Sequence, residues 1–346
     1  MVTYGLLPIA LLLFAIIPYR EALPADGYQF PRDHFEHPAY RTEWWYYTGT
    51  LKDTNGKSYG FELVFFRQGA RDTIAKVNDR PNESAWRIDD LYLAHAAVTE
   101  IDAKQFHYAE RLNRAGPGLA GANFNKRRVW NGNWQMQWDG ERQNLTATAE
   151  DFRFNLQLVP TKPFVIHGLN GVSQKAEGVG RASHYVSFPR LRATGTLNGA
   201  AVQGEAWMDH EWFTQQLDKS QTGWDWFSAQ FDDGTELMLF DLRRKDGKPD
   251  AYSAGTFIDR AGAPHHLAAA DFTLRPIAYW KRYPIEWQIS IPSLKLETTC
   301  KAALPNQELI ATKSNTTYWE GAVRYTGSHQ GRGYLEMTGY EKPVSL

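Results

Sequence analysis

The chain has 346 residues, a net charge of −1 and one cysteine, Cys300. This length is enough for two domains, and the near-neutral charge argues against a nucleic-acid partner, which would need a clustered basic surface. A single cysteine excludes an internal disulfide and a cysteine-based zinc site. Aromatic residues make up 14% of the chain, with 13 tryptophans, which favours β-sheets whose rings line pockets or join sheets.

Residues 1–22 are predicted to be a signal peptide or signal anchor. The stretch from Tyr4 to Pro18 is apolar and uncharged, yet shorter than the ~20 residues that a membrane-spanning helix needs. We therefore expect export, with the protein in the periplasm or anchored to the membrane and facing the periplasm. Membrane contact is expected only through this segment, and the sequence leaves its cleavage open. Residues 23–41 form a lead-in segment that is expected to pack on the following unit.

Two runs of short strands follow, separated by turns rich in Gly, Asn and Asp. In the first unit, residues 42–218, single strands are predicted at 43–51, 59–67, 91–99, 106–111, 183–189, 191–197 and 203–212. Two strands joined by a turn are predicted within 129–138, and two more within 145–159. In the second unit, residues 219–346, they are predicted at 224–230, 236–243, 251–258, 269–274, 285–291, 294–298, 317–324 and 333–340. This number of strands is typical of small closed barrels or sandwiches. Glu62 lies inside an apolar strand, so it either faces solvent or is buried with a raised pKa.

The stretch from 204 to 244 concentrates the residues with chemical potential. In an extended strand, His210 and Trp212 share one face while Asp209 and Glu211 share the other. An Asp-Gly turn at 231–235 then folds the next strand back antiparallel and brings in Asp241. From this arrangement we expect His210, Trp212 and Asp241 to face one another in a cavity wall.

Six stretches spread over nearly the whole mature chain carry a resemblance to a known family. They are FPRDH (30–34), RTEWWYYTG (41–49), HG (167–168), GRASHY (180–185), WMDHEW (207–212) and GWDWF (223–227). The chain resembles the carotenoid 1,2-hydratase (hydroxyneurosporene synthase) superfamily, and more closely its AttH-type secreted lipocalin-like branch. The resemblance implies an all-β fold of two tandem lipocalin-like antiparallel β-barrels.

The resemblance also implies catalytic positions. In the carotenoid hydratases these are a His-x-Trp pair, which matches His210 and Trp212, and a Tyr-x-Asp pair, which aligns with Leu239 and Asp241. Leu239 departs from the family pattern. In this hypothesis Asp241 donates a proton, with its pKa raised by burial, Trp212 stabilises a carbocation through its ring face, and His210 positions or deprotonates water.

Two functions remain open at this point. The first is an exported protein that binds an apolar lipid or isoprenoid ligand between or within the barrels, with an envelope transporter as a partner. The alternative is a cofactor-independent hydratase, isomerase or cyclase that acts on an isoprenoid-like alkene by acid catalysis. A serine hydrolase is not favoured because no Gly-x-Ser-x-Gly motif occurs. No cofactor is expected, and no metal site, since consecutive strand residues cannot converge on one ion. The residues expected to contact the ligand are Trp44, Trp45, His95, His184, Tyr185, Glu211, Trp224 and Trp226.

Overall fold

The computed structural model describes residues 19–70, 88–313 and 316–344, so most of the predicted signal segment lies outside the described residues. Within them, the only helices are four short 3-10 helices: η1 (Pro24–Asp26), η2 (Arg32–His34), η3 (Ala269–Asp271) and η4 (Pro292–Leu294). Among the described residues, no helix has the length and apolarity required to cross a membrane. The predicted all-β fold is confirmed.

The first sheet contains thirteen strands, and every pairing is antiparallel. Its main path runs β4-β3-β2-β1-β13-β12-β9-β8-β7-β6-β5, and β10 and β11 pair with β12. The strands are β1 (Thr42–Asp53), β2 (Ser58–Gly69), β3 (Asp90–Glu100), β4 (Gln105–Arg114), β5 (Ala120–Asn123), β6 (Arg128–Asn131), β7 (Trp134–Asp139), β8 (Arg142–Thr148), β9 (Arg153–Pro160), β10 (Val165–Ile166), β11 (Ser173–Gln174), β12 (Ala182–Leu197) and β13 (Ala200–Phe213).

The second sheet contains ten strands, also antiparallel. Its main path runs β17-β16-β15-β14-β23-β22-β20-β19-β18, and β21 pairs with β22. The strands are β14 (Gln221–Phe231), β15 (Glu236–Arg244), β16 (Ala254–Ile258), β17 (Pro264–Ala268), β18 (Thr273–Trp280), β19 (Tyr283–Ile291), β20 (Leu296–Ala302), β21 (Glu308–Ala311), β22 (Thr316–Gly327) and β23 (Gly331–Met337).

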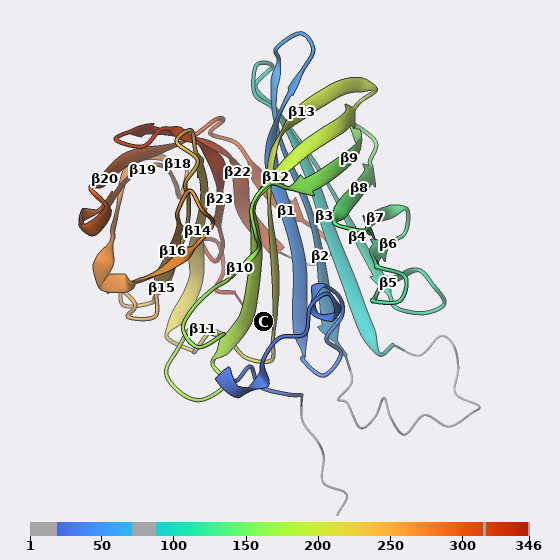
Figure 1. Ribbon diagram of the computed structural model, residues 1–346, viewed down its shortest axis with the longest axis horizontal. Coiled ribbons are helices and arrows are strands. Elements are labelled where there is room, and N and C mark those ends of the chain that lie inside the picture. Colours follow the sequence, from blue (N-terminus) through green and yellow to red (C-terminus); the bar gives the residue numbers. More distant parts are fainter. Residues whose placement is uncertain (1–18, 71–87, 314–315, 345–346) are drawn as a thin grey trace, which may run out of the picture.

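Both sheets curl into barrel-like bodies that stand side by side (Figure 1). In the first, Asn131 of β6 bridges the two ends of the strand path: it accepts a hydrogen bond from Asn113 of β4 at 2.6 Å and donates one to the backbone oxygen of Tyr92 of β3 at 2.9 Å. The expected architecture of two antiparallel β-barrels is therefore confirmed.

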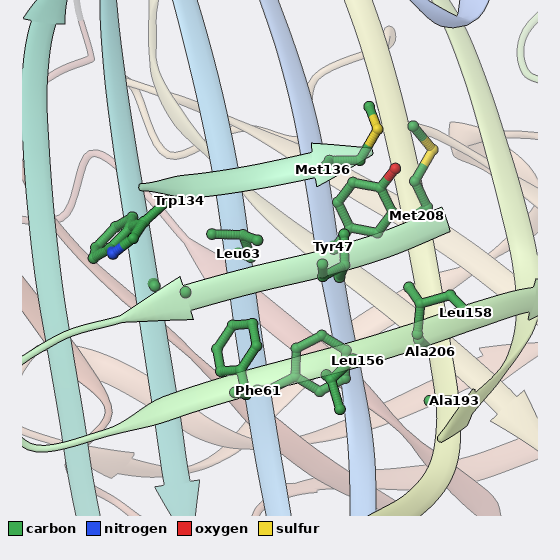
Figure 2. Packing of buried hydrophobic residues seen from close by; sticks show 14 of the residues in the cluster. Tyr47, Phe61, Leu63, Trp134, Met136, Leu156, Leu158, Ala193, Ala206 and Met208 are labelled. Carbon is green, nitrogen blue, oxygen red and sulfur yellow. The ribbon is translucent and has the colours of Figure 1, made fainter. Parts of the chain in front are cut away.

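Strand alternation explains why β1 is buried on both faces. Trp45 and Tyr47 point into the core of the first barrel, where Tyr47 packs among Phe61, Leu63 and other apolar side chains (Figure 2). The intervening Tyr46 points the other way and joins a separate apolar cluster that includes residues of both sheets. A strand covered on both faces favours aromatic or apolar residues at successive positions, which accounts for the run from Trp44 to Tyr47.

The two sheets meet along β1, β2, β12 and β13 on one side and β14, β15, β22 and β23 on the other (Figure 1). Polar side chains join them as well. Arg190 of β12 donates to Glu236 of β15 at 2.6 Å, and Gln230 of β14 donates to the backbone oxygen of Ala206 of β13 at 2.9 Å. The inter-sheet seam is thus a packed interface that encloses a cavity.

Candidate active site between the sheets

A cavity of about 90 Å³ lies in this seam, and facing strands of both sheets build it. On the first sheet, strand register places Glu211 of β13 between Trp44 of β1 and Tyr185 of β12. One step along β13 on the same face, Asp209 is paired with Tyr46 of β1. Because side chains alternate along a strand, these residues all point away from the first barrel's core and toward the second sheet.

The second sheet supplies a matching row of side chains. Register aligns Phe240 of β15 with Trp226 of β14, Trp226 with Glu336 of β23, and Glu336 with Glu320 of β22. All four line the cavity. The cavity therefore has two carboxyl groups on each side, with aromatic rings between and around them.

Asp209 is the most fully hydrogen-bonded of these carboxyl groups. It accepts hydrogen bonds from the Tyr185 hydroxyl and the Trp207 indole, both at 2.6 Å, and from the hydroxyl of Ser187. His167 contacts the same Ser187 hydroxyl at 2.7 Å. Despite these donors, which favour the charged form, burial raises the pKa of Asp209 to about 7.

Three further carboxyl groups cluster on the β2 and β22 side of the cavity. Glu320 accepts a hydrogen bond from the Tyr46 hydroxyl, and it interacts electrostatically with Glu62 of β2. Burial raises the pKa of Glu62 to about 7 and that of Glu336 to about 8, and it also raises the pKa of Glu320. Like charges close together disfavour simultaneous ionisation, so this cluster retains protons near neutral pH.

Lys175 provides the positive charge at this site. It lies between β11 and β12, is 5% exposed and lines the cavity. Glu211, whose pKa is raised by burial, interacts electrostatically with Lys175 and accepts hydrogen bonds from Ser183 at 2.6 Å and Gln216 at 2.9 Å. One cavity thus holds groups able to donate protons and groups able to accept them.

The mouth of the cavity is aromatic and apolar. Trp44, Phe66, Leu217 and Trp224 line it and are only half-buried. The rings of Trp44 and Trp224 stack across the seam, with centroids 6.4 Å apart. These side chains offer apolar surface to a molecule whose polar end enters the cavity.

A larger groove of about 780 Å³ lies further along the same seam. Exposed Lys52, Arg192 and Arg324 are among its lining residues, together with Glu205 and Asp232. It lacks the buried carboxyl groups of the smaller cavity, and we therefore place the candidate chemistry in the smaller one.

The three residues predicted to be catalytic do not share this cavity. Alternation along β13 was predicted correctly, but the expectation that His210 and Trp212 face the cavity is wrong, since Asp209 and Glu211 occupy that face. His210 instead lies 2.9 Å from Glu43, and burial lowers the pKa of His210 to about 4. Trp212 stacks on His37 of the lead-in segment with centroids 3.8 Å apart.

Asp241 is also directed elsewhere. Its strand neighbours Phe240 and Leu242 line the cavity, so alternation turns Asp241 to the opposite face of β15. There it accepts a hydrogen bond from Ser253 at 3.0 Å and lies opposite Asp225. Burial raises the pKa of Asp241, as expected. The geometry does not bring the predicted catalytic trio together.

Of the predicted ligand contacts, five line the cavity: Trp44, Tyr185, Glu211, Trp224 and Trp226. The other three do not. Trp45 lies in the first core, His95 contacts the Tyr318 hydroxyl at 2.6 Å from behind the cavity wall, and His184 lies 3.2 Å from Asp26 of the lead-in segment. Whether the five contact a ligand stays a prediction.

Sequence reasoning missed several lining residues, including Lys175, Asp209, Glu320 and Glu336. A usable signal was present for two of them. Glu320 and Glu336 are single carboxyl groups inside apolar strand segments, Trp319 to Gly321 and Leu335 to Met337, like Glu62. Lys175 lies in a connecting segment and carries no comparable signal.

Comparison with known proteins supports the resemblance noted above. Among solved structures, the chain is similar to a candidate AttH from Nitrosomonas europaea, with 31% identity, a TM-score of 0.81 and coverage of 93% of this chain and 99% of that one. Kievitone hydratase from Nectria haematococca is similar with 15% identity, a TM-score of 0.69 and coverage of 94% and 95%. CghA, solved with Sch210972, has 13% identity, a TM-score of 0.53 and coverage of 93% and 94%.

The last two similarities concern the fold alone. No curated protein matches the chain. The model of the AttH-like family, however, matches residues 21–340, which is nearly the whole chain. The protein therefore belongs to the AttH-like family.

Proposed function

We propose that the protein binds one end of a mainly apolar small molecule in the inter-sheet cavity and transfers protons to and from it, as a hydratase or isomerase does. The observation that carries this proposal is the set of buried carboxyl groups: Asp209 and Glu336 line one cavity, and their pKa values are raised to about 7 and 8. Burying such groups is costly, and active sites are where such shifts concentrate.

The size of the cavity limits what enters it. A dry cavity of roughly 150 Å³ holds benzene, so about 90 Å³ accepts a branched alkene or another small reacting group. The rest of the molecule would lie against Trp44 and Trp224 at the mouth. A lipid or isoprenoid with one reactive end fits this description.

The chemistry follows from the placement of the acids. Protonated Glu336 donates its proton to one alkene carbon, and the π electrons form the new C–H bond. The neighbouring carbon becomes a cation beside the face of Trp226 or Trp224, which stabilises it by about 0.5 to 2 kcal/mol per contact. Water adds to this carbon and loses a proton to Asp209 or Glu211. The net change is addition of one water, and the reverse sequence is a dehydration.

The family fold is compatible with this chemistry, because kievitone hydratase shares it. The roles that the sequence assigned to Asp241 and Trp212 pass in this proposal to cavity residues: Glu336 is the acid and Trp226 the indole. His210 lies on the opposite face of β13 and has no part in the reaction.

The test is turnover of a panel of linear isoprenoids and hydroxylated isoprenoids by purified protein in ¹⁸O-labelled water, followed by mass spectrometry. Asp209→Asn and Glu336→Gln should each lower the rate about 10² to 10⁴-fold, the usual contribution of a proton-transferring side chain. His210→Gln serves as the matched control and should keep most of the activity. Full activity in both carboxyl variants would overturn the proposed mechanism.

Binding without chemistry is the second candidate, and the aromatic mouth favours it. Its signature would be an unmodified apolar molecule that co-purifies with the protein in native mass spectrometry, together with no turnover of the panel. Export through the amino-terminal segment, and delivery of the ligand to or from an envelope transporter, stay predictions from the sequence under either candidate.

A further inference from the structure

Hydrogen bonds to its backbone N–H and carbonyl groups hold Lys175 in place. Its N–H donates to the backbone oxygen of Arg181 at 2.9 Å, and its carbonyl accepts a hydrogen bond from the Gln221 side chain at 2.8 Å. Gln221 opens β14 of the second sheet, so the segment that carries Lys175 is attached to both sheets. The side chain is therefore positioned by the fold and reaches into the cavity.

The ammonium group of Lys175 meets aromatic rings. Its Nζ lies 3.5 Å from the centroid of the Phe240 ring and 5.3 Å from that of Tyr185. Within the described part of the chain, this Nζ makes no salt bridge and no hydrogen bond. Ring faces attract a cation, but they offer it far less than water or a carboxylate does.

Lys162 is a partly buried lysine with the opposite environment, and it lies at the same inter-sheet seam. Its Nζ donates to Glu236 at 2.7 Å, to the backbone oxygen of Asp259 at 2.8 Å and to that of Gly234 at 2.5 Å. The amine of Lys162 therefore uses all three of its hydrogens in hydrogen bonds, whereas the amine of Lys175 contacts only aromatic rings among the described residues.

Burial lowers the pKa of Lys175, and the nearby carboxyl groups of Glu211 and Asp209 only partly oppose this. A lowered pKa increases the fraction of neutral amine, which is the nucleophilic form. Glu211 and Asp209 line the same cavity as Lys175. Carboxyl groups there can give and take the protons that move when an amine attacks a polar double bond. Nucleophile, proton donors and an apolar mouth therefore coincide in one cavity.

We propose that Lys175 is a nucleophile that captures the carbonyl carbon of an apolar aldehyde or ketone as an imine. The Nζ lone pair forms the N–C bond, and the carbonyl π pair moves to oxygen, which takes a proton from a cavity carboxyl group. Nitrogen then loses a proton to a carboxylate, and the hydroxyl group leaves as water with a second proton while the C=N bond forms. One water is released per imine, and no oxidant or reductant takes part.

This inference rests on the cavity of the proposed function, and it adds molecules with a carbonyl group at the end that enters to the class of ligands the cavity takes. The test uses cinnamaldehyde as the probe, with sodium cyanoborohydride to trap any imine, followed by peptide mapping. Because a lowered pKa raises the fraction of neutral amine near neutral pH, Lys175 should be labelled faster than Lys162 or the exposed lysines.

Lys175→Arg and Lys175→Met should abolish the fast adduct, whereas Lys162→Arg should retain it, with circular dichroism and the melting temperature confirming that each variant folds. Labelling of Lys175 no faster than that of exposed lysines would overturn the inference. The two proposals fail separately. Fast labelling of Lys175 in a protein that turns over no isoprenoid supports the imine and removes the hydration. Turnover of isoprenoids by a protein whose Lys175 is labelled no faster than its exposed lysines does the reverse.

Discussion

Burial raises the pKa of Glu336 to about 8, well above its ordinary value of 4.5, and this couples the stability of the protein to pH. A carboxyl group with a raised pKa binds more protons in the folded state than in the unfolded state. Its contribution to stability is complete below about pH 4.5 and is lost as the pH rises through 8. The free energy of unfolding should therefore fall across this window, by on the order of a few kcal/mol from this group.

Glu336→Gln should flatten this dependence, because glutamine keeps the shape of the side chain without titrating. Urea unfolding at pH values from 5 to 9 measures it, and exposed Glu141→Gln is the control that should leave the slope unchanged. An identical slope in Glu336→Gln would mean that Glu336 ionises normally. The sequence predicted a raised pKa for Asp241 and, as one of two alternatives, for Glu62, but not for Glu336, since a carboxyl group in an apolar strand can equally face solvent.

At the scale of single elements, β13 shows what alternation can and cannot predict. The two faces of Asp209 to Trp212 were predicted correctly from the sequence. Which face meets the second sheet depends on β14, the next strand, and on β23, which lies far along the chain. His210 and Trp212 instead hold the lead-in segment, through Glu43 and His37. The face that resembles a catalytic motif therefore contacts the lead-in segment, and a catalytic role for it stays a prediction.

His37 makes this docking dependent on pH. Burial disfavours its charged form, but Glu43, 2.7 Å away, and Asp33 outweigh burial and raise the pKa of His37. A histidine with a raised pKa stabilises the fold fully below its unfolded pKa of about 6.5, and this stabilisation is lost as the pH rises through the folded value.

His37→Gln should therefore lower the hydrogen-exchange protection of residues 20–41 at pH 6 by roughly 1 to 3 kcal/mol. At high pH the same substitution should lower this protection much less. Hydrogen exchange of these amides, corrected for the intrinsic effect of pH, measures the change. His107→Gln, on the partly exposed β4, should leave the exchange of the lead-in segment as it is. Equal protection in His37→Gln and the unmodified protein at pH 6 would contradict the assignment.

At the scale of the whole molecule, the strand content and the two units were predictable, since both follow from alternation and turns near in sequence. The site was less predictable because strands from both ends of the chain and from its middle build it. Glu211 comes from β13, Lys175 from the segment before β12, Trp226 from β14 and Glu336 from β23. Local patterns do not encode the pairing of one barrel with the other. The seam between the barrels is therefore both the least predictable part of the molecule and the part on which the proposed function depends.

We predict that buried ion pairs keep the inter-sheet seam rigid. Glu236 is fully buried and receives both Arg190, at 2.6 Å, and Lys162, at 2.7 Å, from the first sheet's side. Arg190→Met would leave part of the Glu236 charge uncompensated, and breaking a buried pair costs about 3 to 5 kcal/mol. Because the lost contacts join the two sheets, we expect urea unfolding to change from one transition into two.

Exposed Arg260→Met, which removes a surface pair with Asp233, should change the unfolding free energy by less than about 1 kcal/mol. A single transition with unchanged stability in Arg190→Met would show that apolar packing alone holds the barrels together, and that the cavity between them does not need this network for its shape.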